Sequence, residues 1–186
     1  MAQIFHPRAN TVAIAVLVSI PVVVVLVFVV NYQLHASSYT TGEGRFVDQP
    51  VPFSHKHHVG DLGLDCRYCH GGVDKVAFAG LPPTHTCMTC HSQLFTNAAM
   101  LAPVRQSLAT GIPIRWNRVY RLPDYVYFDH SVHIRNGIGC TTCHGDMSEQ
   151  PLTEKKTPLT MGWCLACHRH PGTHMRDEAD IFDPHV

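Results

Sequence analysis

The sequence predicts a mostly irregular chain with short α-helices and one N-terminal transmembrane helix. Residues 11–30 form a run without a charged side chain. All 13 glycines, and every proline except Pro7 and Pro21, lie beyond residue 36, where they divide the chain into short segments. Within this second part, one cysteine-containing pentapeptide pattern occurs four times. Such segments favour brief helices and little sheet, and the repeated pattern indicates how they are organised.

The apolar run of residues 11–30 is long enough to cross a membrane. As a helix it extends about 30 Å, the thickness of the hydrocarbon core of a bilayer. A cleaved secretory signal is the alternative, but its apolar region is about 7 to 15 residues long and ends at a small-x-small site. Here the run is longer and is followed by Asn31-Tyr32-Gln33. We therefore expect residues 1–35 to be a single uncleaved membrane anchor, spanning at about residues 11–30.

The repeated pentapeptide has the pattern C-x-x-C-H. Its copies are Cys66–His70, Cys87–His91, Cys140–His144 and Cys164–His168. This pattern attaches a c-type haem, because its two thiols form thioethers with the porphyrin and the adjacent imidazole binds the iron. The motifs use every cysteine of the chain: Cys66, Cys69, Cys87, Cys90, Cys140, Cys143, Cys164 and Cys167. The sequence therefore predicts four covalently bound haems c in a haem-cored multihaem cytochrome c domain.

A zinc ribbon is the main alternative for these cysteines. The stretches from Cys69 to Cys87 and from Cys143 to Cys164 fit the spacing C-x₂-C-x₁₅₋₂₀-C-x₂-C. A zinc site made of four cysteines does not need a histidine directly after each pair, yet every pair here has one. The added histidines favour haem over zinc.

The chain contains an internal duplication. Residues 53–58 and 128–133 share the pattern F-x-H-x-x-H, and each copy is followed by two C-x-x-C-H motifs. The repeat predicts two dihaem modules, at about residues 53–91 and 128–168. Together they form one tetrahaem domain, which we expect to cover residues 36–186.

Eight histidines of these motifs match the number of axial positions on four haem irons. The proximal ligands predicted by the haem motifs are His70, His91, His144 and His168. The distal ligands predicted from the two F-x-H-x-x-H motifs are His55, His58, His130 and His133. The match predicts bis-histidine ligation throughout. A six-coordinate iron has no open position for a substrate, so this ligation favours electron transfer over catalysis at the haems.

Other side chains are alternative axial ligands. His57 and His85 each lie beside a motif, so either could replace a predicted distal ligand. Methionine would raise the haem potential, and Met100, Met147 and Met161 are its candidates. None of these methionines recurs at an equivalent position in both halves.

The connecting segments complete the expected organisation. Residues 92–110 are expected to form one or two short helices that end at Gly111. Residues 115–127 interleave arginine with aromatic residues, and we expect them to lie against porphyrin faces and propionates. The polar tail, residues 171–186, is expected to wrap the surface or a neighbour. Lys+Arg and Asp+Glu balance at 14 each, which argues against a nucleic-acid partner.

Several of these segments together resemble one protein family. Residues 49–58, 66–70, 115–118 and 127–130 closely resemble the membrane-anchored multihaem cytochrome c subunit of alternative complex III, a bacterial quinol:electron-acceptor oxidoreductase. The resemblance runs from the anchor to about Pro171. Members of that family are often pentahaem, whereas this sequence offers four covalent sites, and we expect four.

The resemblance implies an electron relay. In that family, polytopic membrane subunits bind and oxidise quinol, an iron–sulfur subunit lies nearby, and the multihaem subunit passes electrons to a monohaem cytochrome c or another periplasmic acceptor. We therefore expect a relay that is not catalytic by itself. It would be anchored by a single pass in the bacterial inner membrane, with its haem domain on the periplasmic side, where cytochrome c maturation occurs.

Two other functions fit the motifs less well. A stand-alone tetrahaem quinol dehydrogenase has one N-terminal anchor and feeds periplasmic reductases, but it commonly carries a methionine shortly after the first haem motif. Here His70 is followed by Gly71-Gly72-Val73-Asp74. A cytochrome c₃ type of carrier that gained an anchor shares the F-x-H-x-x-H motif and is the third hypothesis.

Overall fold

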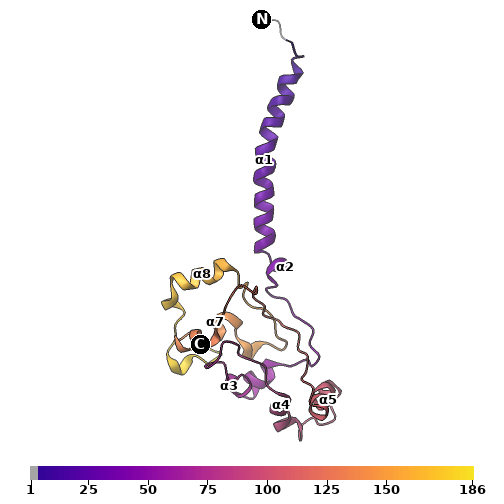
Figure 1. Cartoon of the computed structure of the whole chain (residues 1–186), viewed down its shortest axis with the longest axis vertical. Coiled ribbons are helices and arrows are strands. Elements are labelled where there is room, and N and C mark those ends of the chain that lie inside the picture. Colours follow the sequence, from indigo (N-terminus) through magenta and orange to yellow (C-terminus); the bar gives the residue numbers. More distant parts are fainter. Residues whose placement is uncertain (1–3) are drawn as a thin grey trace. The chain divides into compact units, whose positions relative to one another are not determined.

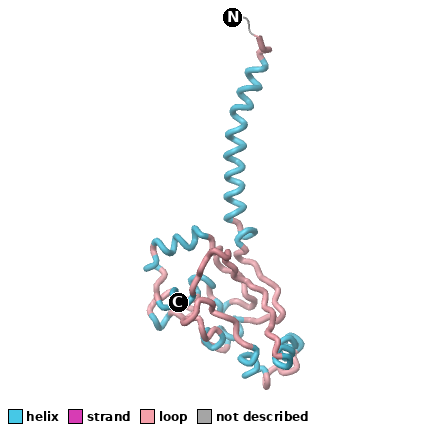
Figure 2. The backbone as a smooth tube through the Cα atoms, viewed as in Figure 1, coloured by secondary structure: helices cyan, strands magenta, loops and turns pink. Residues whose placement is uncertain are grey.

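The computed structural model describes residues 4–186, which form helices and loops without a strand (Figure 2). Two isolated bridges join Phe46 to Glu154 and Ile138 to Met175. The prediction of a mostly irregular chain with short helices and one N-terminal apolar helix is confirmed. The chain divides into two compact units, Met1–Thr41 and Gly42–Val186.

The first unit consists of α1 (Arg8–Ala36) and the short α2 (Ser38–Thr41), drawn in indigo in Figure 1. Within residues 4–186, α1 is the one helix long and apolar enough to cross a membrane. Between residues 12 and 30 its one polar side chain is that of Ser19, whose hydroxyl donates back to the Val16 carbonyl at 3.1 Å. The predicted span lies inside α1, while residues 1–3 of the predicted anchor lie outside the described residues.

The second unit consists of short helices joined by long loops (Figure 1). Its helices are the π-helix η1 (Lys56–Asp61), α3 (Cys66–Cys69), α4 (Thr84–His91), η2 (Ala99–Leu101), α5 (Ala102–Thr110), α6 (His130–Arg135), α7 (Thr141–His144), η3 (Met147–Glu149), α8 (Met161–Arg169), η4 (Pro171–Thr173) and η5 (Glu178–Asp180). Isolated helices of this length are unstable in water, so these depend on caps and tertiary contacts.

Side-chain caps begin several of the helices that carry predicted site residues. Asp65 accepts a hydrogen bond from the backbone N–H of Arg67 at the start of α3, and Thr160 caps α8 in the same way. Asp129 caps α6. Each cap satisfies a backbone donor that a helix start leaves without a partner. Further along, α5 ends at Gly111, as expected, with φ at +70°.

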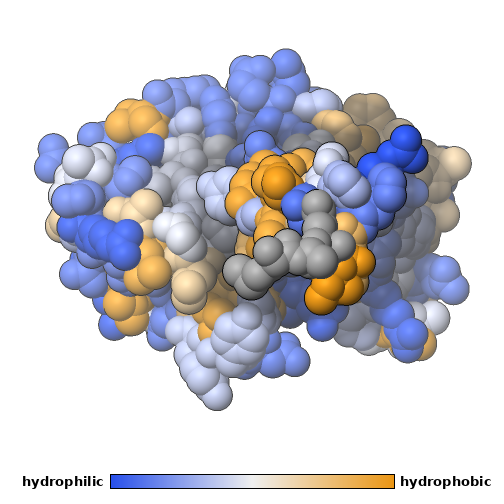
Figure 3. All heavy atoms as spheres, turned by 90° about the horizontal axis from the view of Figure 1, so that it is seen from above, coloured by the Kyte–Doolittle hydropathy of each residue, from blue (hydrophilic) through white to orange (hydrophobic). Residues whose placement is uncertain are grey.

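The apolar core of the second unit is small. One cluster joins Val51, Leu101 and Val104, with Trp116 packed beside it. The other joins Val73 of the first module, Ile134 of the second module and Ile181 of the C-terminal tail. The tail therefore packs between both modules rather than lying only on the surface. Around the edge of the view in Figure 3 the residues are mainly hydrophilic, with hydrophobic residues in separate groups.

The two modules also meet through η1 and η3. An added Cβ at Gly60 would lie 2.5 Å from the carbonyl oxygen of Ser148, so η1 approaches η3 too closely for any side chain there. The backbone N–H of Lys56 donates to the Gln150 carbonyl at 2.9 Å. This contact joins the segment that carries the first distal histidines to the segment that follows the third haem motif.

Candidate haem-binding site

Each C-x-x-C-H motif lies on or at the end of a short helix. In α3 the two cysteines are three residues apart on one helical turn, and His70 is the C-cap. The motif histidine ends α4 and α7, and it lies one residue before the end of α8. All eight cysteines are free thiols. Two thiols on the same side of a turn can both reach one porphyrin, so the motif geometry fits covalent haem attachment.

The predicted proximal and distal imidazoles lie opposite one another in pairs. The ring centroids are 6.2 Å apart for His58 and His91 and 6.0 Å apart for His133 and His168. The third pair, His130 and His144, is 6.5 Å apart. A metal–imidazole bond is about 2 Å long and the bonding nitrogen lies about 1 Å from the ring centroid, so two rings on one metal ion are about 6 Å apart. The observed spacings therefore leave room for one iron between each pair.

The fourth pair consists of His55 and His70. Burial, together with the nearby charge of His70, lowers the pKa of His55 to about 4. Burial also lowers the pKa of His144 to about 4. His55 and His144 are therefore neutral near pH 7, and the neutral imidazole is the form that binds a metal. The charge of His70 acts on His55 more strongly than that of His58 or His144, which favours His70 as its partner.

The Nδ1 atoms of five imidazoles contact backbone carbonyl oxygens. The pairs are His58 with Ser54 at 2.8 Å, His70 with Gly80 at 2.9 Å, His91 with Leu94 at 3.2 Å, His130 with Ala77 at 2.9 Å, and His133 with Asp129 at 2.7 Å. A carbonyl oxygen only accepts hydrogen bonds, so Nδ1 must carry the proton in each ring. Nε2 is then the nitrogen with a free lone pair for iron.

One phenylalanine in each module holds both distal imidazoles. Phe53 stacks on His58 with centroids 4.4 Å apart and meets His55 edge-on at 4.9 Å. Phe128 repeats this arrangement: it stacks on His133 at 4.4 Å and meets His130 edge-on at 4.8 Å. The first residue of the F-x-H-x-x-H motif thus restricts the rotation of the two rings that follow it.

Tyr120, in the arginine and aromatic segment, lies beside a haem motif. Its ring centroid is 4.4 Å from that of His144. The Tyr120 hydroxyl donates to the Glu154 carbonyl at 3.2 Å and accepts from the Lys156 N–H at 2.9 Å, while burial raises its pKa. Arg118, from the same segment, lies over the ring of Phe78.

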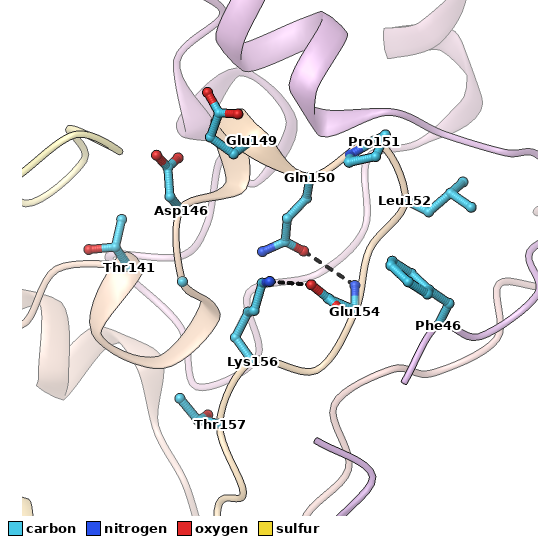
Figure 4. Close-up of a pocket in the computed structure, with 11 residues that line it drawn as sticks. Phe46, Thr141, Asp146, Glu149, Gln150, Pro151, Leu152, Glu154, Lys156 and Thr157 are labelled. Carbon is cyan, nitrogen blue, oxygen red and sulfur yellow. Dashed lines mark hydrogen bonds and ion pairs between the residues drawn. The ribbon is translucent and has the colours of Figure 1, made fainter. Parts of the chain in front are cut away.

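Gln150 supports the third haem motif from the other side. It is only 3% exposed, and its side-chain amide donates to the His144 carbonyl at 2.9 Å and accepts from the Glu154 N–H at 3.2 Å. Figure 4 shows it beside a pocket of about 400 Å³ next to α7, where Lys156 forms an ion pair with Glu154. The end of α7 is therefore fixed by a buried polar network.

The four motifs form a row. The Tyr68 hydroxyl and the Thr89 hydroxyl, one from each of the first two motifs, are 2.8 Å apart. The Cys66 and Cys140 thiols lie close enough together that their interaction lowers the pKa of Cys66 and raises that of Cys140, and the Cys66 thiol donates to the Phe182 carbonyl at 3.7 Å. Burial raises the pKa of Cys143 to about 11, and the nearby charges of the two cysteines of the fourth motif raise it as well. The spatial order is therefore second, first, third and fourth motif.

The alternative ligands are more exposed or have other partners, although the His57 ring also meets the His58 ring edge-on at 5.4 Å. The His57 ring faces the Asp61 carboxylate at 3.3 Å, and both side chains are more than half exposed. His85 lies on an exposed face of α4. Met100 and Met161 are 60% and 79% exposed. Met147 is half-buried in η3. Within residues 4–186, no group of three or more His, Cys, Asp or Glu could hold a metal ion.

Several contacts around the histidines have no sequence signal of their own. The hydroxyl of Thr153 lies 3.1 Å from Nδ1 of His55, and the acceptors for His70 and His130 are main-chain carbonyls. Gln150, six residues after His144, likewise belongs to no motif. The duplication could have revealed the role of Phe53 and Phe128, because both begin the repeated motif.

Comparison with known proteins yields a multihaem cytochrome. No family model matches the chain. The chain is 38% identical over 142 residues to the "Menaquinone reductase, multiheme cytochrome c subunit" of Nitratidesulfovibrio vulgaris, which covers 65% of this chain and 68% of that protein. This similarity supports the multihaem cytochrome c predicted from the motifs, but does not single out alternative complex III. The chain belongs to the family of this multihaem cytochrome c subunit.

Proposed function

We propose that this chain carries four haems c, each with two axial histidines, and conducts electrons along them. The observation that supports this most directly is the set of imidazole pairs, with ring centroids 6.0 to 6.5 Å apart in three cases. The proposed axial pairs are His70 with His55, His91 with His58, His144 with His130, and His168 with His133. The eight motif cysteines form the thioethers.

The protein's part in this chemistry is to hold and orient the imidazoles. A bound haem supplies an iron that changes oxidation state by one electron. Backbone carbonyls at Nδ1 of five imidazoles would leave Nε2 of those rings for the iron, and Phe53 and Phe128 restrict the distal rings. Two histidines at each site would leave no position on the iron for a substrate, so the chemistry that the haems would supply is one-electron transfer between sites.

The row of motifs gives the relay an order. Electrons would enter at one outer haem, held by Cys87–His91 or Cys164–His168, and pass through the two inner haems. The inner motifs touch through the Cys66 and Cys140 side chains, which is why we place the exchange between modules there. A row of six-coordinate haems conducts in either direction, so the potentials of donor and acceptor set the direction.

We propose that the partners are those of a quinone-linked membrane complex. The relative's name places it in a menaquinone reductase. Resemblance to the alternative complex III subunit supports polytopic quinol-binding subunits, an iron–sulfur subunit, and a monohaem cytochrome c or another periplasmic acceptor. Residues 1–35 would anchor the chain in the bacterial inner membrane through α1, and residues 36–186 would form the periplasmic tetrahaem domain.

Mass spectrometry of the detergent-purified protein under denaturing conditions tests the cofactor assignment. We expect the polypeptide plus four haems, and one haem fewer after both cysteines of any single motif are changed to alanine. A haem-free product that contains zinc would contradict the proposal.

Quinol oxidation tests the relay assignment. The purified chain should be reduced by dithionite but show little turnover with a quinol analogue, because a single membrane helix offers no cleft between helices for a quinol. In the intact complex, the same haems should be reduced rapidly, and an inhibitor of the quinol site should block this reduction. Turnover of the isolated chain at the rate of the complex would instead identify a stand-alone quinol dehydrogenase.

A further inference from the structure

Each module supplies a hydrogen-bond partner to a distal histidine of the other module. The Nδ1 atom of His55, in the first module, lies 3.1 Å from the hydroxyl oxygen of Thr153, in the second. In the opposite sense, Nδ1 of His130 donates to the carbonyl of Ala77, in the first module, at 2.9 Å. Both histidines belong to the inner haem sites, where the modules meet.

The two partners occupy similar places in the duplicated chain. Ala77 follows His70 in the loop after the first motif, and Thr153 follows His144 in the loop after the third motif. The partner groups nevertheless differ. Ala77 offers a main-chain carbonyl, whereas Thr153 offers a side-chain hydroxyl, which a substitution can remove.

We propose that Thr153 is a positioning residue for the haem held by His70 and His55, supplied by the opposite module. This inference rests on the ligand assignment of the proposed function. With Nε2 of His55 as the iron ligand, Nδ1 would carry the proton and donate a hydrogen bond to the Thr153 hydroxyl oxygen. A hydrogen bond of this kind fixes the ring orientation and makes the imidazole a stronger donor to the metal, which favours the ferric state.

The surroundings of Thr153 hold its hydroxyl in place. Glu154, the next residue, donates its N–H to the buried Gln150 side chain at 3.2 Å and forms the bridge with Phe46 (Figure 4). The Gln150 carbonyl in turn accepts from the Lys56 N–H, one residue after His55. The Thr153 segment is therefore attached to the helix that follows the histidine it contacts.

The potential of this inner haem then depends on how the modules dock. Any movement of the loop 150–154 away from η1 would lengthen the contact between Thr153 and His55. The potential of the haem held by His144 and His130 depends on docking in the same way, through the contact of His130 with the Ala77 carbonyl. A carbonyl oxygen is a stronger hydrogen-bond acceptor than the Thr153 hydroxyl. The two inner sites should consequently have different potentials although their motifs are alike.

A redox titration of the full-length protein in its complex tests the proposal. Thr153→Val keeps the shape of the side chain and removes its oxygen, whereas Thr153→Ser keeps the oxygen. We expect Thr153→Val to raise one of the four midpoint potentials, by up to a tenfold change in the ferric to ferrous ratio, which corresponds to about 59 mV for one electron. One low-spin ferric signal in the electron paramagnetic resonance spectrum should change with it. Thr153→Ser should behave like the parent.

A matched control and a ligand variant separate the possible failures. Thr110, whose hydroxyl donates to the Gln106 carbonyl in α5, offers Thr110→Val as the control, which should leave all potentials unchanged. His55→Met should raise one potential strongly. If His55→Met changes nothing, the ligand assignment in the proposed function is wrong. If His55→Met acts but Thr153→Val matches the parent, only the role of Thr153 is overturned. Should Thr153→Val lose a haem, Thr153→Ala is titrated instead, and a parent-like result overturns the proposal.

Discussion

The two modules are alike close to the F-x-H-x-x-H motif and differ where they reach each other. Phe53 and Phe128 stack on their second histidines at the same 4.4 Å, with interplanar angles of 25° and 28°. In both modules that second histidine donates from Nδ1 to the carbonyl four residues before it. All of these contacts form within six consecutive residues, so the same geometry occurs in both modules.

The differences arise from contacts between the modules. The motif leads into the π-helix η1 in the first module and into the α-helix α6 in the second. In η1 the N–H of Leu62 donates to the carbonyl of His57, five residues earlier, where Gly60 lies against Ser148. The comparison indicates that the F-x-H-x-x-H motif sets the geometry of the distal imidazoles. Contacts between the modules account for the difference between η1 and α6.

The largest effect is expected from removing an inner haem. In Cys66→Ala/Cys69→Ala and in Cys140→Ala/Cys143→Ala, the row should lose one of its two central sites. Electron exchange between the outer haems should then fall by orders of magnitude in both variants, measured by stopped-flow reduction of the remaining three haems. Cys164→Ala/Cys167→Ala is the control, because it removes an outer site and leaves three neighbouring haems, which should exchange electrons as in the parent. Equal slowing of electron exchange among the three remaining haems in all three variants would contradict the spatial order of the motifs.

A smaller effect, on stability, should distinguish η1 from α6. Gly60→Ala places a Cβ 2.5 Å from the Ser148 carbonyl, so the modules must shift, at a cost of about 2 kcal/mol in the free energy of unfolding. Arg135, which follows Ile134 in α6 as Gly60 follows Val59 in η1, is exposed and donates from Nε to the Asp74 carbonyl at 3.1 Å, so Arg135→Ala removes one exposed hydrogen bond and should cost at most about 1 kcal/mol. Denaturant titration followed by haem absorbance measures both. Similar costs would show that the close contact of η1 with η3 is unimportant for stability.

The smallest effect should come from the shared phenylalanines and should be the same in both modules. Phe53→Leu and Phe128→Leu remove the stacked ring and should each cost about 1 kcal/mol. Each should also alter the ferric low-spin signals of two haems, because one phenylalanine contacts two distal imidazoles. Phe46→Leu is the control, since Phe46 is 58% exposed and contacts no histidine ring. If only one of the two variants altered the ferric low-spin signals, the two F-x-H-x-x-H motifs would not be equivalent.

Much of this architecture could be predicted from local patterns. The uncharged run at residues 11–30 predicted α1, and the spacing within C-x-x-C-H predicted turns that present two cysteines together. The repeat of F-x-H-x-x-H predicted which histidines would lie near the motif histidines. These features depend on residues close together in sequence, where helical geometry limits the outcomes.

The remaining features depend on residues far apart in sequence. Thr153 is 98 residues from His55, and Ala77 is 53 residues from His130. The π-helical form of η1 follows from a contact with η3, which no pattern in residues 56–61 specifies. The order of the four motifs likewise depends on how two halves of one chain dock, and a single sequence does not encode that in any short motif.

Main-chain carbonyls orient five of the imidazoles, and no side-chain substitution can remove a main-chain carbonyl. Random mutation therefore has few ways to disturb those five rings without unfolding the loop that presents the carbonyl. Thr153 is different, since a single nucleotide change can replace its hydroxyl. Over evolutionary time, descendants of this chain could retune one redox centre at this position while inheriting the other ligand orientations almost unchanged.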